Sequence, residues 1–344
     1  MGRGSKLQYL LSQLYWFAHL LAASLHYFCF FTSSQNVLAA LNEVNKIMSY
    51  DLTGKVIMIT GANSGIGKAA SLQLAKLGAT VVMTARSRER GEQARESVQV
   101  AATRTKVDLM LVDMSSRDSI LEFTDAFQQR YDRLDVLIHN AANFDHTQKK
   151  PVLTVDGLEN IFATNHLGPF LLTQLLLNKL IASAPSRVIT VASKGLMSYP
   201  FLDIEFDNLY GERKFNMQHA YYHSKQAQVM FTFDLAERLR GTGVTVHCVR
   251  VGNVAIPNER LRHLPGWLLK MYEFKRKLSM TPEKMAETYV WLAADPVLEQ
   301  QTGKYWDAPG VEVKANKNAY NKETQKHLWT VSELLTSGVE HDLD

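Results

Sequence analysis

The stretch that decides the fold is Lys55–Gly67, KVIMITGANSGIG, in which an apolar run leads directly into a glycine-rich turn. The run Lys55–Thr60 is short and almost continuously apolar, which is typical of a buried parallel strand. A segment of helical period, Gly65–Leu77, begins at the last glycines. Strand, glycine turn and helix in this order predict the first unit of a βαβ fold.

The same alternation continues along the chain and predicts one α/β domain. Five further apolar runs predict strands, and segments of helical period lie between the runs. We expect a single doubly wound Rossmann domain over residues 48–325, with a mostly parallel seven-stranded sheet, and a C-terminal helix and tail over 326–344. The further strands are predicted at Thr80–Thr84, Asp108–Val112, Asp135–His139, Arg187–Val191 and Val244–Val251, and the further helices at Ser116–Tyr131, Gly157–Ala182 and Ala220–Leu239.

Composition excludes several classes of protein. With 46% hydrophobic and 21% charged residues, the chain has the material for a packed core, which excludes disordered and fibrous proteins. The net charge of +4 comes from interspersed charges, so no nucleic-acid footprint is present. The 2 cysteines make no disulfide framework, and the 11 histidines have no ligand spacing. We therefore predict no nucleic-acid partner and no metal.

The first 47 residues form an apolar N-terminal extension. Leu7–Asn42 contains no Asp, Glu, Lys or Arg, and 19 of the 25 residues in Leu7–Phe31 are apolar or aromatic. As a helix, this stretch would measure roughly 37 Å against a hydrocarbon layer of roughly 30 Å. We expect an apolar helix that attaches the protein to a membrane, at the endoplasmic reticulum or a lipid droplet. The alternatives are a docking helix or a dispensable extension on a cytoplasmic protein, because Met48 stands just before the first strand.

The glycine turn predicts a dinucleotide site. Directly after a parallel strand, such a turn places backbone N–H groups and a positive helix terminus against a pyrophosphate, while missing side chains allow close approach. The alternative is a tight turn without a ligand. The residues expected to contact the cofactor here are Gly61, Asn63, Ser64, Gly65, Ile66 and Gly67.

The end of the second predicted strand indicates which dinucleotide binds. Arg86 stands there, where a carboxylate would accept a hydrogen bond from the ribose 2′-hydroxyl of NAD. A guanidinium favours a 2′-phosphate instead, so NADP is predicted ahead of NAD. The alternative is that Arg86 and Arg88 are a solvated start to the next helix.

Tyr221 and Lys225 are the candidate proton-transfer pair. They are four residues apart in a predicted helix and therefore lie on one face. A nearby ammonium favours phenolate, so we expect the pKa of Tyr221 to be lowered toward neutrality, which suits proton transfer at a carbinol oxygen. Ser193 ends the fifth strand, at the edge where doubly wound sheets bind ligands.

From about Leu52 onward, the chain resembles the short-chain dehydrogenase/reductase family, in its retinol-dehydrogenase-like and WW-domain-oxidoreductase-like branch. The resemblance rests on the glycine turn, Asp113, Asn140-Ala141-Ala142, Asn165, Ser193 and Tyr221 with Lys225. It implies that Asp113 contacts adenine, that Asn140 steadies the central strand, and that Asn165 supports a water relay. It also implies that Tyr221 is the acid or base, that Ser193 binds the substrate oxygen, and that Lys225 holds the nicotinamide ribose. Gly252 and Val254, after the sixth strand, are expected to complete the cofactor site.

Three positions depart from the family's pattern. Ala142 and Val251 stand where the family usually has glycine and proline, and Ile256 stands near a common threonine that contacts the nicotinamide carboxamide. Isoleucine cannot make that hydrogen bond. The alternative function is therefore a catalytically weak NADP-binding regulatory or scaffold protein of the same fold.

Residues 257–281 are expected to form a substrate lid. Apolar and basic residues mingle there, so the segment could line a pocket for a lipophilic substrate and face anionic lipid headgroups. A surface helix packed on the domain is the alternative. The expected reaction moves a hydride between nicotinamide and a lipophilic carbonyl or alcohol, such as a retinoid, steroid or lipid aldehyde. The sequence leaves the oligomeric state open, with a homodimer as one alternative.

Overall fold

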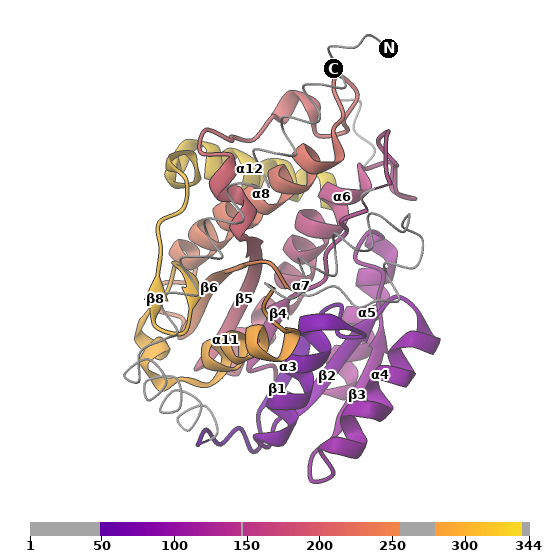
Figure 1. The fold of residues 1–344 in the computed structure, drawn as a ribbon, viewed down its shortest axis with the longest axis vertical. Helices are drawn as coiled ribbons and strands as arrows, with labels where there is room; N and C mark the ends of the chain where they lie inside the picture. The colour runs from indigo at the N-terminus through magenta and orange to yellow at the C-terminus, as the bar shows by residue number, and fades with distance from the viewer. Residues whose placement is uncertain (1–48, 146, 255–278, 339–344) are drawn as a thin grey trace.

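The computed structural model describes residues 49–145, 147–254 and 279–338. One sheet with the order β3-β2-β1-β4-β5-β6-β7-β8 forms its centre, and helices cover both faces (Figure 1). The first seven strands in chain order are parallel, and β8 pairs antiparallel with β7. The strands are β1 (Val56–Ile59), β2 (Thr80–Ala85), β3 (Val107–Leu111), β4 (Val136–His139), β5 (Ser186–Ser193), β6 (Val244–Val251), β7 (Lys304–Ala308) and β8 (Val311–Glu312).

Alternate strand residues feed two cores on opposite faces of the sheet. On one face, Ile57 packs with side chains of α3 (Gly65–Lys76), α4 (Arg88–Ala101) and α11 (Pro282–Ala294). On the other face, Met58 packs with side chains of α5 (Arg117–Arg130), α7 (Gly168–Ala182) and α8 (Met217–Arg238). Helices of this kind on both faces are what a doubly wound parallel sheet requires.

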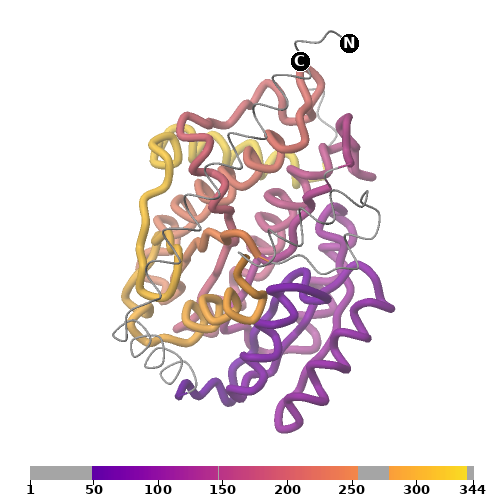
Figure 2. Tube along the Cα trace, in the orientation of Figure 1, coloured from indigo at the N-terminus to yellow at the C-terminus, as the bar shows by residue number. Residues whose placement is uncertain are grey.

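The end of the described chain packs back onto the domain. Helix α12 (Lys322–Thr336) lies along α8, and Figure 2 shows this C-terminal trace returning beside it. The Trp329 ring meets Phe170 edge-on at 5.0 Å between ring centroids. The short elements are α6 (Asn160–Phe162), the π-helix η1 (Ala163–Leu167), and the 3₁₀ turns η2 (Lys194–Ser198), η3 (Phe206–Asn208), η4 (Pro296–Gln300) and η5 (Lys317–Tyr320).

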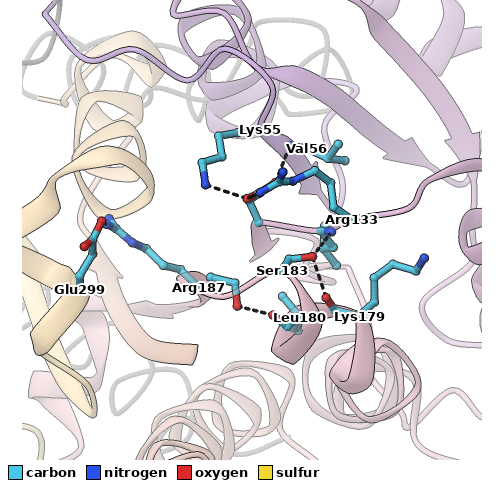
Figure 3. Close-up of polar contacts among 11 residues, drawn as sticks. Lys55, Val56, Arg133, Lys179, Leu180, Ser183, Arg187 and Glu299 are labelled. Atoms are coloured by element: carbon cyan, nitrogen blue, oxygen red, sulfur yellow. Dashed lines mark hydrogen bonds and ion pairs between the residues drawn. The ribbon is translucent and has the colours of Figure 1, made fainter. Parts of the chain in front are cut away.

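Polar contacts connect the strands at their amino ends, on the side of the sheet away from the glycine turn (Figure 3). The Asp135 carboxylate accepts hydrogen bonds from the Val56 backbone N–H at 2.9 Å and from Lys55 Nζ at 3.0 Å, which joins β4 to β1. Although burial opposes it, hydrogen bonding led by Arg133 lowers the pKa of Asp135. Arg187 is buried and donates to the Leu292 and Asp295 carbonyls at 2.8 Å each, where a cation complements the carboxyl end of α11.

The predicted α/β fold is confirmed, with three differences in detail. The sheet has eight strands instead of seven, and β8 was not predicted because its two residues are too few to form an apolar run. The helix expected over Gly157–Ala182 starts at Asn160 and contains the π-helical turn η1. The C-terminal helix begins at Lys322 rather than 326, where Asn321 accepts hydrogen bonds from the N–H groups of its first turn.

Several predictions lie outside the described residues. These are the apolar helix within residues 1–47 and nearly all of the expected lid, from Pro257 to Leu278. Among the described residues, no helix combines the length and the apolar character needed to cross a bilayer.

Candidate active site

The glycine turn joins β1 to α3 as the sequence predicts. Gly61 and Gly65 adopt left-handed φ values of +64° and +58°, which favour glycine. A Cβ atom on Gly67 would lie 2.5 Å from Asn140 Nδ2 and 2.9 Å from the Gly61 carbonyl oxygen, so no side chain fits there. Without side chains at these positions, a ligand can approach the backbone N–H groups closely, and the N-terminus of α3 lies in the same turn. The turn therefore fits a dinucleotide pyrophosphate.

Asn140 holds this turn against the end of β4. Its Nδ2 donates to the carbonyl oxygens of Thr60 at 2.9 Å and Gly61 at 3.1 Å. Its Oδ1 accepts a 3.2 Å hydrogen bond from the Tyr289 hydroxyl of α11. Tyr289 is fully buried and was missed in the sequence analysis, because nothing in its local sequence links α11 to Asn140.

Arg86 and Asp113 lie together at the carboxyl ends of β2 and β3. Arg86 Nη1 is 3.9 Å from Asp113 Oδ2, and the Arg86 side chain is 68% exposed. Asp113 is fixed by Ser115, whose N–H and hydroxyl both donate to Oδ1. Helix α4 begins at Arg88 with Ser87 as its cap, so Arg86 stands in the connection before the helix. An exposed guanidinium at this strand end fits a phosphate.

Ser193, Tyr221 and Lys225 meet at the carboxyl ends of β5 and β6. Ser193 is the last residue of β5, and Tyr221 and Lys225 lie on α8. Lys225 is 1% exposed, and its Nζ donates a 2.7 Å hydrogen bond to the Val191 carbonyl. The same Nζ lies 5.8 Å from the centroid of the Tyr221 ring. The spacing therefore places both residues on one face, as predicted.

The expected lowering of the Tyr221 pKa is wrong for this structure. Burial, with a contribution from Tyr222, raises the pKa of Tyr221, and a hydrogen bond with Ser193 opposes the shift. Burial lowers the pKa of Lys225 to about 8. The helix spacing reveals only the nearby lysine charge, whereas desolvation of a buried phenol shifts the pKa in the other direction.

The two neighbouring tyrosines have different surroundings. Tyr221 is half-buried as a residue, and its ring lies 4.1 Å from the Phe144 ring, centroid to centroid. Tyr222 is buried, and a Cβ atom on Gly195 would lie 2.1 Å from its hydroxyl oxygen. Tyr222 therefore packs beneath the chain that follows Ser193, and burial raises its pKa to about 12.

Asn165 lies in the π-helical turn η1 and connects two parts of the site. Its Oδ1 accepts from the Asn143 N–H at 2.6 Å, and its Nδ2 donates to the Asn143 carbonyl at 3.1 Å and to Ser224 Oγ at 3.0 Å. Ser224 in turn donates to the Tyr221 carbonyl at 2.7 Å. Single π-helical turns often mark functional sites. Asn165 thus links the segment after β4 to the first turns of α8.

The segment after β6 is described as far as Val254. Val254 forms an isolated parallel bridge with Met280, and a Cβ atom on Gly252 would lie 3.7 Å from Lys194 Cδ. An acid that the local sequence does not reveal lies beside this segment: Asp307 accepts a hydrogen bond from Arg250 Nε at 2.8 Å and pairs with Lys194 Nζ at 3.1 Å. Ile256 lies outside the described residues.

All the described candidate residues follow the carboxyl ends of strands or face them from α8 and η1. Arg86 and Asp113 lie at β2 and β3, the glycine turn lies in the middle, and Ser193, Tyr221 and Lys225 lie at β5. In the part of the chain that the structure describes, no group of three His, Cys, Asp or Glu side chains is placed to hold a metal.

Comparisons with known proteins identify chains that are similar to this one. A family model described as short chain dehydrogenase matches residues 55–203. Human retinol dehydrogenase 14 is 38% identical over 296 residues, covering 82% of this chain and 86% of that protein. Bovine retinol dehydrogenase 12 is 39% identical over 285 residues, covering 83% and 87%.

Solved structures show the same fold. An uncharacterised protein from Mycobacterium paratuberculosis aligns with a TM-score of 0.63 at 26% identity, covering 85% of this chain and 97% of that one. A short-chain dehydrogenase from Shigella flexneri, solved with NADP, aligns with a TM-score of 0.58 at 22% identity, covering 75% and 99%.

Proposed function

Because this chain belongs to the short-chain dehydrogenase family, we propose that it is an NADP-dependent oxidoreductase that moves a hydride between nicotinamide and a lipophilic carbonyl or alcohol. The observation that carries the proposal is the meeting of Ser193, Tyr221 and Lys225 at the carboxyl ends of the strands, the same side of the sheet that carries the glycine turn. A phenol, a hydroxyl and a buried lysine at one sheet edge suit proton transfer to a carbonyl oxygen. Asn165, through Ser224, supports the same helix turn.

In this proposal, Tyr221 transfers the proton at its Oη atom. Because burial raises its pKa, Tyr221 is a neutral phenol near pH 7, which is the form that can donate to a carbonyl oxygen. Ser193 Oγ donates a hydrogen bond to the same oxygen and orients it. Lys225 lies under the Tyr221 ring and stabilises negative charge that develops on the phenol. The nicotinamide, when bound, supplies or accepts the hydride.

The preference for NADP rests on Arg86. Its exposed guanidinium stands at the end of β2, and a doubly wound fold places the adenosine ribose near that strand end. A 2′-phosphate would gain a charge-assisted hydrogen bond there, whereas NAD would meet no carboxylate from residue 86. Asp113 is proposed to contact the adenine, with Gly252 and Val254 at the nicotinamide end.

The substrate class rests on the relatives and on the expected lid. The curated relatives are named as retinol dehydrogenases, which act on a lipophilic alcohol. We extend that class to this chain as a retinoid, steroid or lipid aldehyde, with residues 257–281 as the lid. We further propose that residues 1–47 attach the protein to a membrane, at the endoplasmic reticulum or a lipid droplet.

The competing function is a catalytically weak NADP-binding scaffold, suggested by Val251 and Ile256. Titrating the purified protein with NADPH, first alone and then with a panel of lipophilic aldehydes, separates the two functions. An enzyme oxidises NADPH, seen as a loss of absorbance, only when an aldehyde is present. Binding without oxidation for every aldehyde and alcohol tested would favour the scaffold.

A further inference from the structure

A row of buried polar side chains crosses the sheet beneath the proposed catalytic pair. His139 of β4 pairs in register with Thr190 of β5, and Thr190 pairs with Cys248 of β6. All three are fully buried. Each lies two residues after an apolar residue of its strand, namely Leu137, Val188 and Val246, whose side chains pack with those of α7 and α8. Residues two apart in a strand point to the same face of the sheet. The row therefore faces the helix that carries Lys225.

His139 has one satisfied and one unsatisfied nitrogen. Its Nε2 lies 2.7 Å from Thr173 Oγ1, whose own proton is donated to the Pro169 carbonyl at 2.7 Å. Nε2 must therefore carry the proton and donate to Thr173. Nδ1 is then a bare acceptor, and it has no hydrogen-bond partner among the described residues. A buried acceptor without a partner is costly and calls for an explanation.

Gln228 of helix α8 also has buried polar atoms without hydrogen-bond partners among the described residues. It is fully buried, and neither its amide oxygen nor its amide nitrogen has a partner in the described part of the chain. It stands three residues after Lys225 and four before Thr232, so it shares their face of α8. Thr232 on that face contacts Thr190 at 2.6 Å, which places Gln228 above the same row of the sheet.

Lys225 borders the same row, because its Nζ donates a 2.7 Å hydrogen bond to the carbonyl of Val191, the residue that follows Thr190 in β5. Burial and then the charge of Lys225 lower the pKa of His139 to about 3, so the imidazole is neutral and keeps its acceptor nitrogen. The other titratable groups around Lys225 and Tyr221 are Cys248 of β6, Tyr222 of α8 and Tyr289 of α11. Burial raises the pKa of Cys248 to about 11, so its thiol is also neutral near pH 7.

We propose that His139 and Gln228 hold a buried water that accepts a hydrogen bond from Lys225 Nζ, and that both are positioning residues for this lysine. Such a water would donate to His139 Nδ1 and to the Gln228 oxygen, and would accept from Lys225 and the Gln228 nitrogen. Buried waters typically satisfy two to four otherwise unpaired polar groups in this way. The consequence is a lysine kept protonated beneath Tyr221. The inference rests on the proposed role of Lys225, but the first measurement below needs no turnover.

Two substitutions at one position separate this role from a structural one. In His139→Asn, the amide oxygen takes the place of Nδ1 and keeps the acceptor, but the bond to Thr173 is lost. In His139→Gln, the amide nitrogen takes the place of Nε2 and keeps the bond to Thr173, but the acceptor at Nδ1 is lost. Gln228→Met removes both amide atoms at similar volume and provides an independent variant.

The measurement is the NMR titration of Lys225 in protein labelled at lysine Cε, without cofactor. Lys225→Met identifies the signal by its loss. His139→Gln and Gln228→Met should each lower the Lys225 midpoint by about 1 pH unit, and His139→Asn should leave it within about 0.3 units, because a hydrogen bond to a charged group is lost only in the first two. Two results would overturn the proposal. One is a Lys225 midpoint that moves equally in His139→Asn and His139→Gln, and the other is a midpoint that is unchanged in both Gln228→Met and His139→Gln.

A second readout detects the water itself. The Gln228 side-chain amide should show a cross-peak to water in a rotating-frame NOE experiment on the wild-type protein, and His139→Gln should weaken it. Absence of that cross-peak in the folded wild-type protein contradicts a buried water. Because neither readout depends on a substrate, failure of the proposed enzymatic function would leave both results interpretable.

Discussion

Lys225 Nζ lies 5.8 Å from the centre of the Tyr221 ring and is anchored 2.7 Å from the Val191 carbonyl of β5. The i, i+4 spacing brings the two side chains together, and the hydrogen bond to β5 fixes the position of the Lys225 ammonium group. The buried surroundings that place the pair also raise the pKa of Tyr221 and lower that of Lys225 to about 8. Desolvation therefore disfavours the charged form of both residues.

The first prediction concerns cofactor choice. Arg86→Asp should shift the preference from NADPH toward NADH, because it replaces attraction for a 2′-phosphate with repulsion and offers a carboxylate to a 2′-hydroxyl. We expect the ratio of the two dissociation constants to change by at least about tenfold, which requires only about 1.4 kcal/mol. Fluorescence titration with both cofactors measures it, and Arg88→Asp is the matched control. An unchanged ratio would remove Arg86 from the site.

The second prediction concerns acid sensitivity. Burial, as the first cause at each site, lowers the pKa of four histidines, to about 3 for His139, His166 and His247 and to about 4 for His223. The unfolded chain binds these protons below a pH of about 6.5, whereas the folded chain does not, so the stabilisation present above that pH is lost as the pH falls. Between pH 7 and 5.5, the free energy of unfolding should fall by about 1 kcal/mol for each histidine.

Urea unfolding at the two pH values tests this expectation. His166 packs among Phe162, Phe170 and Phe231, so His166→Phe removes one titrating group within an aromatic cluster. That variant should lose about 1 kcal/mol less than the wild type over the same interval. Equal stability at both pH values in the wild type would mean that these histidines are not held neutral.

The third prediction concerns location. A chain beginning at Met48 should stay folded and catalytic but leave the membrane fraction, because every described candidate residue lies after Met48. Burial of the apolar side chains of Leu7–Phe31 in lipid contributes about 0.8 kcal/mol per CH₂. Fractionation at high salt and at alkaline pH compares the two chains. Full-length protein that washes off as readily as the shortened chain would show that the segment is no anchor.

The sequence predicts the positions of six of the eight strands, β1 to β6, and the order of the site residues, because both depend on local pattern. Apolar runs identify the buried parallel strands, and positions directly after them meet at one edge. Helix spacing likewise brings Tyr221 to Lys225. These features need no knowledge of distant contacts.

The remaining features depend on contacts between residues far apart in the chain. Tyr289 reaches Asn140 across 149 positions, and Asp307 reaches Arg250 across 57. The strand β8 has only two residues, which is too few to show an alternation of apolar and polar side chains. The π-helical turn at Asn165 interrupts a segment in which the spacing of apolar residues is helical throughout. The pKa of Tyr221 was mispredicted because its burial follows from tertiary packing, against Phe144 among others, and not from the i, i+4 spacing.

The decisive experiment on the proton-transfer residue compares Tyr221→Phe with Tyr222→Phe. Each substitution removes one hydroxyl and keeps the ring, but only Tyr221 is four residues from Lys225 on the same face of α8. The measurement is NADPH oxidation with a reactive lipophilic aldehyde, together with NADPH binding by fluorescence for both variants. Tyr221→Phe should lose at least about a hundredfold in turnover while binding NADPH normally, since general acid catalysis typically contributes 10²–10⁴-fold. Tyr222→Phe should keep most of its turnover, and equal activity of the two variants would contradict the assignment of Tyr221 as the proton-transfer residue.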